Sequence, residues 1–408
     1  MALNYIWVGF FLIAFVVGLI KLIVFGDTEV FALMMKALFD RSKLGFELSI
    51  GLTGILALWM GIMKIGENGG VIKALSKLLS PVFRILFPGV PKGHPAIGSM
   101  MMNFSANMIG LDNAATPLGL KAMSELQELN PKKDTASNAQ IMFLVMNTSG
   151  LTLIPVSIIA LRVSANANNP LGIFIPILIA TFVSTLVGVL ITAIIQKLNL
   201  LYIGLISLIG AGSLFVLITY LKSLPADKLE LYSQLFANIL LFGVIILFIL
   251  IGLFKKINIY DSFIQGAKDG FQVAVKIIPY LVAMLAAIGV FTASGAMGYF
   301  TDGLRFAFAA TGLDTTFVDA LPTAVMKPLS GSGARALMVE SWNNFGVDSF
   351  VGKLTSVLQG STETTFYVLA VYFGSVGIKN TRYAAAVGLL ADLAGVIAAI
   401  IVSYIFFG

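Results

Sequence analysis

Long apolar runs dominate the chain and predict membrane-spanning helices. Four nearly continuous runs occupy about residues 3–25, 171–195, 198–221 and 231–254, and Lys21 is the single charged residue among them. Each run has the roughly 20 residues that an α-helix needs to cross a bilayer. Because MALNYIW lacks the basic segment of a cleavable signal, we expect the first run to be retained. The pattern predicts an all-α polytopic membrane protein.

Shorter apolar segments, interrupted by Gly, Asn, Ser, Thr and Pro, flank the central runs and follow one order in both halves. The order is a spanning helix, a Gly-marked turn, an amphipathic helix, a first polar break, and a second polar break with an apolar segment after it. Aligning Met102 with Met326 and Asn147 with Gly360 superposes these features, so we interpret them as a divergent internal repeat. Its relative orientation, inverted or parallel, stays open. The predicted parts are an N-terminal half, 1–199, connecting transmembrane helices, 200–256, and a C-terminal half, 257–408.

Paired interruptions of this kind are a sequence signature of a binding site near the middle of the bilayer. Backbone N–H and C=O groups cannot face lipid unsatisfied, so a broken helix persists at membrane depth only inside protein or beside a wet cavity. We therefore expect the breaks of the two halves to face each other.

The first break, NFSANMIGLDNAATP, offers Asn103, Ser105, Asn107 and Asn113. An apolar run leads directly into this cluster, which favours a site. The alternative is a plain turn at the membrane surface, because Asn113 is also a favoured helix cap.

The second break, MNTSGLTLIPVSII, contains Asn147, Thr148, Ser149 and Thr152. Pro155 cannot donate a backbone hydrogen bond and disfavours helix just before it, so the segment is predicted to be bent or interrupted. The alternative is a proline kink whose free backbone groups bond to one or two hydroxyl groups. The four polar side chains of this segment are more than such a kink requires.

The third break, MKPLSGSGARALM, carries Lys327, Ser330, Ser332 and Arg335. A Gly-rich loop before a helix can hold an anion, and neighbouring cations strengthen that binding. A nucleotide-hydrolysing P-loop is excluded because GxxxxGK[ST] does not occur. The alternative is a tight hairpin tip whose two cations extend to the membrane interface.

The fourth break lies in LQGSTETTFYVLAVYFG, whose polar candidates are Gln359, Ser361, Thr362, Glu363 and Thr364. An ionisable group is costly to keep in a membrane, which makes Glu363 a functional candidate, with Lys327 or Arg335 as its expected partner. Asp392, in the last apolar run, is a second such group. It is either an ion-coupling residue or a structural partner for a neighbouring helix.

Composition narrows the chemistry further. Apolar residues make up 58% of the chain and charged residues 11%, against roughly 25% charged in soluble domains. The chain has no cysteine, which excludes disulfides and thiolate metal sites. The single histidine, His94, lies in a Pro- and Gly-rich linker and is interpreted as a loop residue. The net charge of +6 fits Lys and Arg on the cytoplasmic side of a membrane, so we expect no nucleic-acid partner. We also expect no cofactor and no metal.

The motifs resemble those of a known family. NFSANMIGLDNAATPLGLKAM with NTSGLTLIPVSIIALR resembles spore maturation proteins of the A type, and KPLSGSGARALM with QGSTETTFYVLAVYFGSVGIKNTRYA resembles the B type. This resemblance implies a bacterial inner-membrane protein made of two nucleoside recognition, or Gate, domains, with broken helices and hairpins around a central polar site. Gate domains also occur in concentrative nucleoside transporters. By similarity, the solute would contact Asn103, Asn107 and Asn147–Ser149 in one half and Ser330, Ser332 and Gln359–Thr364 in the other.

The resulting hypothesis is a secondary transporter of a small polar solute such as a nucleoside. Glu363 and Asp392 would bind a coupling proton or Na⁺, and a homodimer is an arrangement that the sequence leaves open. The alternative is a structural or regulatory membrane module in envelope or spore maturation that transports nothing. An enzyme is not expected, because GxSxG, HExxH and a Cys–His pair are all missing from the sequence.

Overall fold

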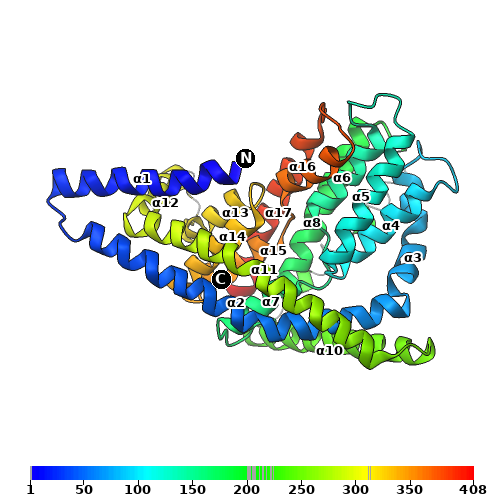
Figure 1. Cartoon of the computed structure of the whole chain (residues 1–408), viewed down its shortest axis with the longest axis horizontal. Helices are drawn as coiled ribbons and strands as arrows, with labels where there is room; N and C mark the ends of the chain where they lie inside the picture. The colour runs from blue at the N-terminus through cyan, green and yellow to red at the C-terminus, as the bar shows by residue number, and fades with distance from the viewer. Residues whose placement is uncertain are drawn as a thin grey trace.

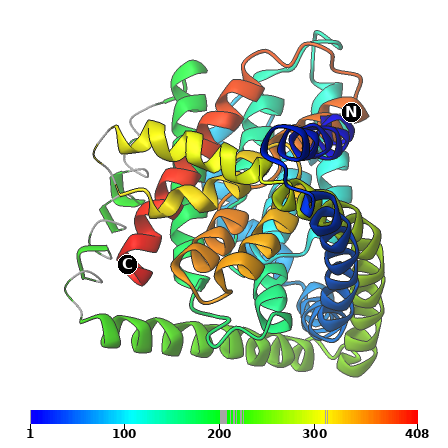
Figure 2. The same cartoon turned by 90° about the vertical axis from the view of Figure 1, so that its left-hand side faces the viewer.

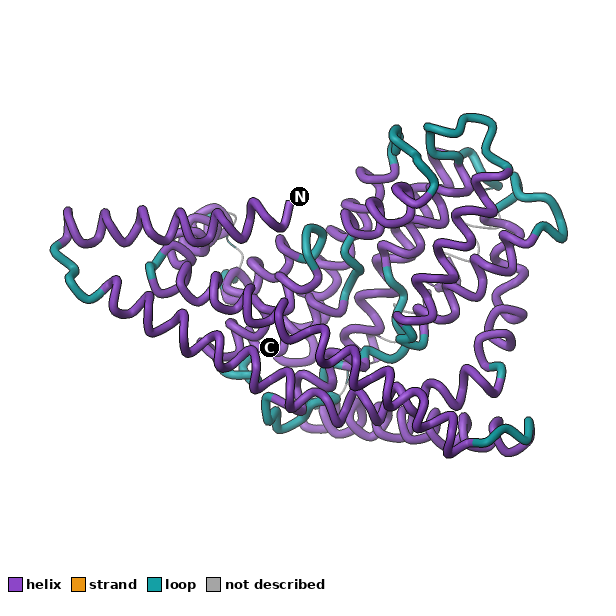
Figure 3. The backbone as a smooth tube through the Cα atoms, in the orientation of Figure 1, coloured by secondary structure: helices purple, strands orange, loops and turns teal. Residues whose placement is uncertain are grey.

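The computed structural model describes residues 2–199, 204, 208–210, 212, 213, 216, 218–220, 223, 225–310, 312 and 314–408. Helices dominate this part of the chain, in which no strand occurs (Figure 3). Six helices in it are long and apolar enough to cross a membrane, which confirms the predicted polytopic all-α class. Half of the predicted run at 198–221 lies outside the described residues. The six spans are Asn4–Phe25, Val30–Gly69, Phe174–Ile195, Gln234–Phe254, Ile259–Ala293 and Ala384–Phe407.

The helices of the two halves follow one another in matching order, as the internal repeat predicts (Figure 1). The first half consists of α1 (Ala2–Phe25), α2 (Val30–Gly69), α3 (Val71–Leu86), α4 (Pro95–Met108), α5 (Asp112–Glu128), α6 (Asn138–Ser149), α7 (Val156–Ser164) and α8 (Phe174–Ile195). The second consists of α10 (Ala226–Phe254), α11 (Ile259–Ala293), α12 (Ala296–Ala309), the 3-10 helix η1 (Thr316–Ala320), α13 (Leu321–Met326), α14 (Gly331–Phe345), α15 (Phe350–Gly360), α16 (Thr365–Ser375) and α17 (Ala384–Phe407).

The predicted Gly-marked turns occupy equivalent places in the two halves. Gly70 joins α2 to α3 with a φ of 89°, and Gly295 joins α11 to α12 with a φ of 90°. Only glycine adopts such positive φ angles without strain. A glycine with a positive φ angle therefore occupies the equivalent turn in each half.

The long helices α2 and α11 cross in antiparallel contact, side by side in Figures 1 and 2. The backbone of Gly270 lies against Leu56 and Ala57, whereas Gly45 lies against Leu281 and Val282 further along the pair. An added Cβ at Gly270 would lie 2.6 Å from the carbonyl oxygen of Leu56. Glycine thus permits a close backbone approach at both crossings.

The equivalent helices α8 and α17 are also antiparallel. Gln196, which follows α8, donates to the carbonyl of Asn138, and Arg382, which precedes α17, donates to the side chain of the same Asn138. At the opposite end, Ile173 and Phe407 line one small cavity. Because equivalent helices run in opposite directions in both pairs, the two halves form an inverted repeat.

The halves are interleaved rather than separate. Helix α16 packs against α5 and α6 of the first half, and α7 packs against α2 and α15. Helix α10 packs along α2 in the same way that α1 packs along α11. Helix α10 is therefore the counterpart of α1 in the repeat, although its residues fall in the predicted connecting segment. The division of the chain at residues 199 and 257 itself stays a prediction.

Candidate functional site

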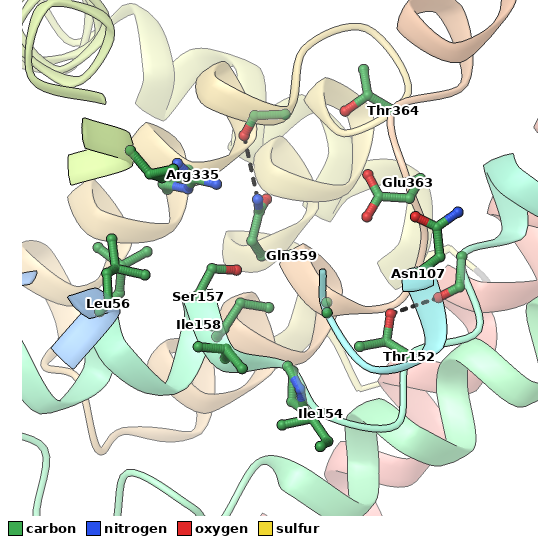
Figure 4. A pocket seen from close by; sticks show the side chains of 18 of the residues that line it. Leu56, Asn107, Thr152, Ile154, Ser157, Ile158, Arg335, Gln359, Glu363 and Thr364 are labelled. Carbon is green, nitrogen blue, oxygen red and sulfur yellow. Dashed lines mark hydrogen bonds between the residues drawn. The ribbon is translucent and has the colours of Figure 1, made fainter. Parts of the chain in front are cut away.

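All four polar breaks meet at one cavity of about 210 Å³ (Figure 4). Its wall includes Asn107 and Gly110 from the first break, Thr152 from the second, Arg335 from the third, and Glu363 from the fourth. Apolar side chains from α2, α7 and α11 also line it. The expectation that the breaks of the two halves face each other is confirmed.

The first break is a turn between α4 and α5 that pairs with the second. Gly110 has a φ of 76°, and an added Cβ there would lie 2.9 Å from the carbonyl oxygen of Ile154. The N–H of Leu153 donates to the carbonyl of Met108 across 2.7 Å. Two non-helical segments thus satisfy each other's backbone groups, as a site within a membrane requires.

The second break is non-helical from Gly150 to Pro155, as Pro155 predicts. A capping box of Ser137 and Gln140 starts α6, and Gly150, with a φ of 59°, ends it. The hydroxyl of Thr152 donates to the carbonyl of Gly150 across 2.8 Å. This turn places Thr152 at the cavity and lets α7 begin again after Pro155.

The third break positions the start of α14. Ser330 is its N-cap, since the hydroxyl accepts from the N–H of Gly333 at 3.0 Å and lies 3.2 Å from the hydroxyl of Ser332. Lys327, Gly331 and Arg335 line the cavity, and the Lys327 side chain is otherwise buried. The first turn of α14 therefore borders the cavity, with two cations beside it.

The fourth break follows α15 and is held by its neighbours. The N–H of Glu363 donates to the carbonyl of Thr148 at 2.8 Å, and Phe366 donates to the carbonyl of Pro328 at 3.0 Å. The Gln359 side chain donates to the carbonyl of Gly331 at 3.3 Å. These bonds tie the fourth break to the second and the third.

Asp392 lies behind the cavity rather than in its wall. Its side chain is 2% exposed and accepts a hydrogen bond of 2.7 Å from the hydroxyl of Thr365. Lys327 and Glu363 both lie within electrostatic range of this carboxylate. The buried carboxylate next to the cavity fits either role that the sequence left open.

A network of amides connects the cavity to the helices behind it. Asn107 donates to Asn147 at 2.8 Å, Asn147 donates to the carbonyl of Phe143 at 2.9 Å, and Tyr372 bridges Asn147 to Asn103. Sequence reasoning missed Tyr372, because an aromatic residue in an apolar run carries no signal of a hydrogen-bonding role. Asn147 thus orients Asn107, which reaches the cavity itself.

The structure divides the predicted site residues into two groups. Those that line the cavity are Asn107, Thr152, Lys327, Arg335, Gln359, Thr362, Glu363 and Thr364. Those that lie behind its wall or at its ends are Asn103, Ser105, Asn147, Thr148, Ser149, Ser330, Ser332, Ser361 and Asp392. The side chain of Asn113 lies outside what the structure describes. That any of these residues binds a solute stays a prediction.

Several residues of the second group satisfy local backbone groups. The hydroxyls of Thr148, Ser149 and Ser361 donate to the carbonyls of Val145, Met146 and Leu358 in their own helices. Ser105 lies 3.3 Å from the hydroxyl of Ser76 on α3. Ser157, which sequence reasoning missed, lines the cavity from the first turn of α7.

Comparison with known proteins agrees with this architecture. The nucleoside recognition (Gate) family matches residues 49–165 and 274–379, which together exceed half of the chain. The chain belongs to the Gate family. The matched regions include all four breaks of this Gate protein, one pair in each region, and no solved structure matches the chain.

Two curated relatives are spore maturation proteins of the two types that the sequence motifs resemble. Spore maturation protein B of Bacillus subtilis (strain 168) is 47% identical over 181 residues, which are 44% of this chain and 95% of the relative. Spore maturation protein A of the same organism is 38% identical over 188 residues, 46% of this chain and 92% of the relative. The Gate protein is therefore homologous to both, and each relative matches over nearly its whole length.

Proposed function

We propose that this Gate protein is a secondary transporter of a small polar solute, with nucleosides as the first candidates. The observation that carries the proposal is the meeting of four interrupted segments, from two inverted halves, at one polar cavity. Inverted repeats with discontinuous helices near the bilayer midplane are the architecture of many secondary transporters. The name of the family, nucleoside recognition, supports the choice of first solute.

The two carboxylates supply a means of ion coupling. Glu363 lines the cavity, and Asp392 lies behind it within electrostatic range of Lys327 and Glu363. A proton or Na⁺ bound at these carboxylates would change the charge next to the solute. The gradient of that ion would then drive accumulation of the solute.

We place the protein in the inner membrane of a bacterium, as the spore maturation relatives suggest. The exposed apolar side chains of α1 and α10, such as Ile23 and Phe254, would contact lipid or a second copy of the chain.

Uptake into proteoliposomes tests the transport function. Purified protein is reconstituted, and a panel of labelled nucleosides, amino acids, sugars and polyols is presented under an inward proton or Na⁺ gradient. We expect saturable uptake of at least one solute that collapses when the gradient is removed. The substitution Gln359→Ala should reduce it, whereas Gln265→Ala, on the exposed side of α11, should not. Uptake no greater than that of empty liposomes over the whole panel contradicts transport.

A second candidate is a structural or regulatory membrane module, and the names of the two relatives favour a part in spore maturation. The two functions differ in what they require of the cavity. Transport predicts that Glu363→Gln and Asn147→Ala abolish the phenotype in a host that depends on the protein. A structural module predicts that both variants complement the host whenever membrane fractions contain wild-type amounts of protein.

A further inference from the structure

Two backbone carbonyls set the direction of the hydrogen bonds behind the cavity. The amide nitrogen of Asn103 donates to the carbonyl of Ala115 at 2.8 Å, and that of Asn147 donates to the carbonyl of Phe143 at 2.9 Å. A carbonyl only accepts, so both amides have a fixed orientation. We propose, on the basis of the transport function above, that this network turns the amide oxygen of Asn107 toward the cavity. The cavity then requires a solute that presents a hydroxyl or N–H donor to this oxygen.

Tyr372 carries the direction of donation from Asn103 to Asn147. Its hydroxyl accepts from the amide nitrogen of Asn103 at 3.2 Å, and it donates its single proton to Oδ1 of Asn147 at 3.4 Å. Gly119 of α5 makes room for the hydroxyl, because an added Cβ there would overlap its oxygen. The ring of Phe143 stacks on the other side, with centroids 5.8 Å apart. The tyrosine hydroxyl is therefore held in one place between the two amides.

Asn147 passes this direction on to Asn107. Its Oδ1 accepts from the amide nitrogen of Asn107 at 2.8 Å, in addition to the hydroxyl of Tyr372. The side chain of Asn147 is buried, with 3% of the residue exposed. Reversing its amide would place the nitrogen against two donors and the oxygen against the carbonyl of Phe143, which is unfavourable in a buried place. The amide of Asn107 is thereby limited to one orientation, with its nitrogen toward Asn147.

The amide oxygen of Asn107 is accessible from the cavity. The side chain is half-buried and lines the cavity, and Figure 4 shows its oxygen on the side of Glu363 and its nitrogen on the other side. Within the described part of the chain no group donates to this oxygen, which is open rather than buried. An amide oxygen accepts up to two hydrogen bonds. An O–H or N–H group of the solute is its chemical complement.

Glu363 gives this side of the cavity the same preference. Its side chain lies beside Asn107 in Figure 4, and an ionised carboxylate accepts hydrogen bonds without donating any. A carboxylate or phosphate of a solute would meet two acceptors here, which leaves all of them unpaired. The solute class is therefore a molecule whose hydroxyl or N–H groups face Asn107 and Glu363, whatever groups it carries elsewhere.

Binding of matched probes to the purified full-length protein tests the donor. The probes are uridine and four analogues that each lack one donor, namely 2′-deoxyuridine, 3′-deoxyuridine, 5′-deoxyuridine and 3-methyluridine. We expect isothermal titration to show about tenfold weaker binding for at least one analogue, because its loss leaves an acceptor unpaired. The identity of that analogue tells whether a hydroxyl or the N–H faces Asn107. Should uridine not bind, L-serine is compared with L-alanine, and glycerol with propane-1,2-diol.

Three variants show whether the amide network sets this preference. The readout is the ratio of the affinities for the parent probe and its weak analogue. Asn107→Leu and Asn147→Leu should lower the ratio from about ten to about one, since the acceptor is removed in the first and loses its orientation in the second. Asn147→Asp should keep the ratio, because a carboxylate still accepts from Asn107. A general folding defect would weaken both probes together and leave the ratio unchanged.

Tyr372→Phe separates the tyrosine from the asparagines. It removes one of the two donors to Asn147 and should lower the ratio by about two- to threefold. Tyr383→Phe is the matched control, because it also loses a hydroxyl bonded to an asparagine, Asn138, but lies outside the cavity. Asn68→Leu is the control for the asparagine variants, since Asn68 bonds to Ser262 away from the cavity. Both controls should keep the wild-type ratio.

An NMR measurement tests the orientation of Asn107 without any solute. In protein that contains ¹⁵N-labelled asparagine, the signal of the Asn107 side chain is assigned by its loss in Asn107→Leu. Because its amide nitrogen is bonded to Asn147, its protons should exchange with water more slowly than those of the exposed Asn166. This protection should disappear in Asn147→Leu and persist in Asn147→Asp.

The outcomes separate this inference from the proposed function. Equal affinity for each parent probe and all its analogues overturns the solute donor, and so does a ratio that Asn147→Leu leaves unchanged, even where uptake supports transport. Exchange at Asn107 as fast as at Asn166 overturns the orientation, whatever the uptake shows. If the folded protein, verified by gel filtration and thermal unfolding, takes up no solute of the broad panel, transport itself is contradicted and the solute donor with it.

Discussion

The main chain of Glu363 donates its N–H to the carbonyl oxygen of Thr148 across 2.8 Å. The bond joins the second break of one half to the equivalent break of the other. Gly150, just after Thr148, makes room for it, because an added Cβ would lie 2.9 Å from Cγ of Glu363. One inter-half hydrogen bond and one glycine therefore position the carboxylate that lines the cavity.

Gly150→Ala should displace Glu363 and destabilise the protein. The φ of 59° is unfavourable for alanine, and the added methyl group would press on the Glu363 side chain. We expect a loss of about 1–3 kcal/mol in the free energy of unfolding, together with reduced solute uptake. Thermal unfolding in detergent and proteoliposome uptake measure the two effects.

Gly54→Ala is the matched control, because an added Cβ there has no atom within 4 Å. Gly54 lies inside α2, so alanine should be neutral or stabilising by up to about 1 kcal/mol. Wild-type stability and uptake in Gly150→Ala would show that Gly150 does not set the position of Glu363.

Asp392→Asn should uncouple transport without preventing solute binding. Asparagine keeps the hydrogen bond from Thr365 but has no charge with which to hold a proton or Na⁺. We expect exchange of labelled for unlabelled solute to continue while accumulation driven by an ion gradient is lost. Counterflow and gradient-driven uptake in the same proteoliposomes distinguish the two processes.

The control for this variant is Asp302→Asn on the exposed face of α12, where Asp302 pairs with Arg305. It should leave both processes unchanged. Gradient-driven accumulation at the wild-type level in Asp392→Asn would assign Asp392 to the structural role that the sequence left open.

The interruptions could be predicted because their signals are local. Pro155 and the glycines at positions 150 and 295 each force or permit a particular backbone conformation, whatever surrounds them. The order of these signals in the two halves was enough to indicate the repeat. The breaks accordingly appear where the sequence indicated them.

The detailed site could not be predicted, because it depends on the way helices are placed against each other. Asn103 and Asn107 lie one turn apart on the same face of α4, yet only Asn107 lines the cavity, and Asn103 instead donates to the carbonyl of Ala115. Spacing along one helix cannot decide which turn is level with the cavity. The same limit applies to Tyr372, whose partners are distant in sequence.

The inverted orientation of the two halves also could not be predicted from the sequence. Orientation depends on the number of membrane crossings between equivalent helices, and broken helices such as α6 and α7 make that number ambiguous. The antiparallel contacts of Gly45 and Gly270 along α2 and α11 decide it.

Removing the cation of a buried ion pair should be among the most destabilising single changes. Arg41 of α2 donates to both carboxylate oxygens of Glu340 of α14, at 2.6 and 3.0 Å, and Glu340 is 3% exposed. Arg41→Gln leaves a buried charge without its partner, for which we expect about 3–5 kcal/mol of lost stability. Detergent-based thermal unfolding measures the loss.

Lys43→Gln removes an exposed pair with Glu47 and should change stability by less than about 1 kcal/mol. The double variant Arg41→Met with Glu340→Leu should recover much of the loss, because apolar residues of similar size can replace a buried ion pair. A loss in Arg41→Gln no larger than that in Lys43→Gln would mean that the pair does not hold α14 to α2.

Gly266→Ala should separate the crossing helices α2 and α11. An added Cβ would lie 2.2 Å from the carbonyl oxygen of Met60, and this atom belongs to a rigid helix backbone that cannot move aside locally. We expect a loss of about 1–3 kcal/mol, as for an overpacked core. Gly243→Ala in α10, where an added Cβ meets no atom within 4 Å, is the control. If both variants unfold at the wild-type temperature in detergent, the two helices do not require a glycine for their close approach.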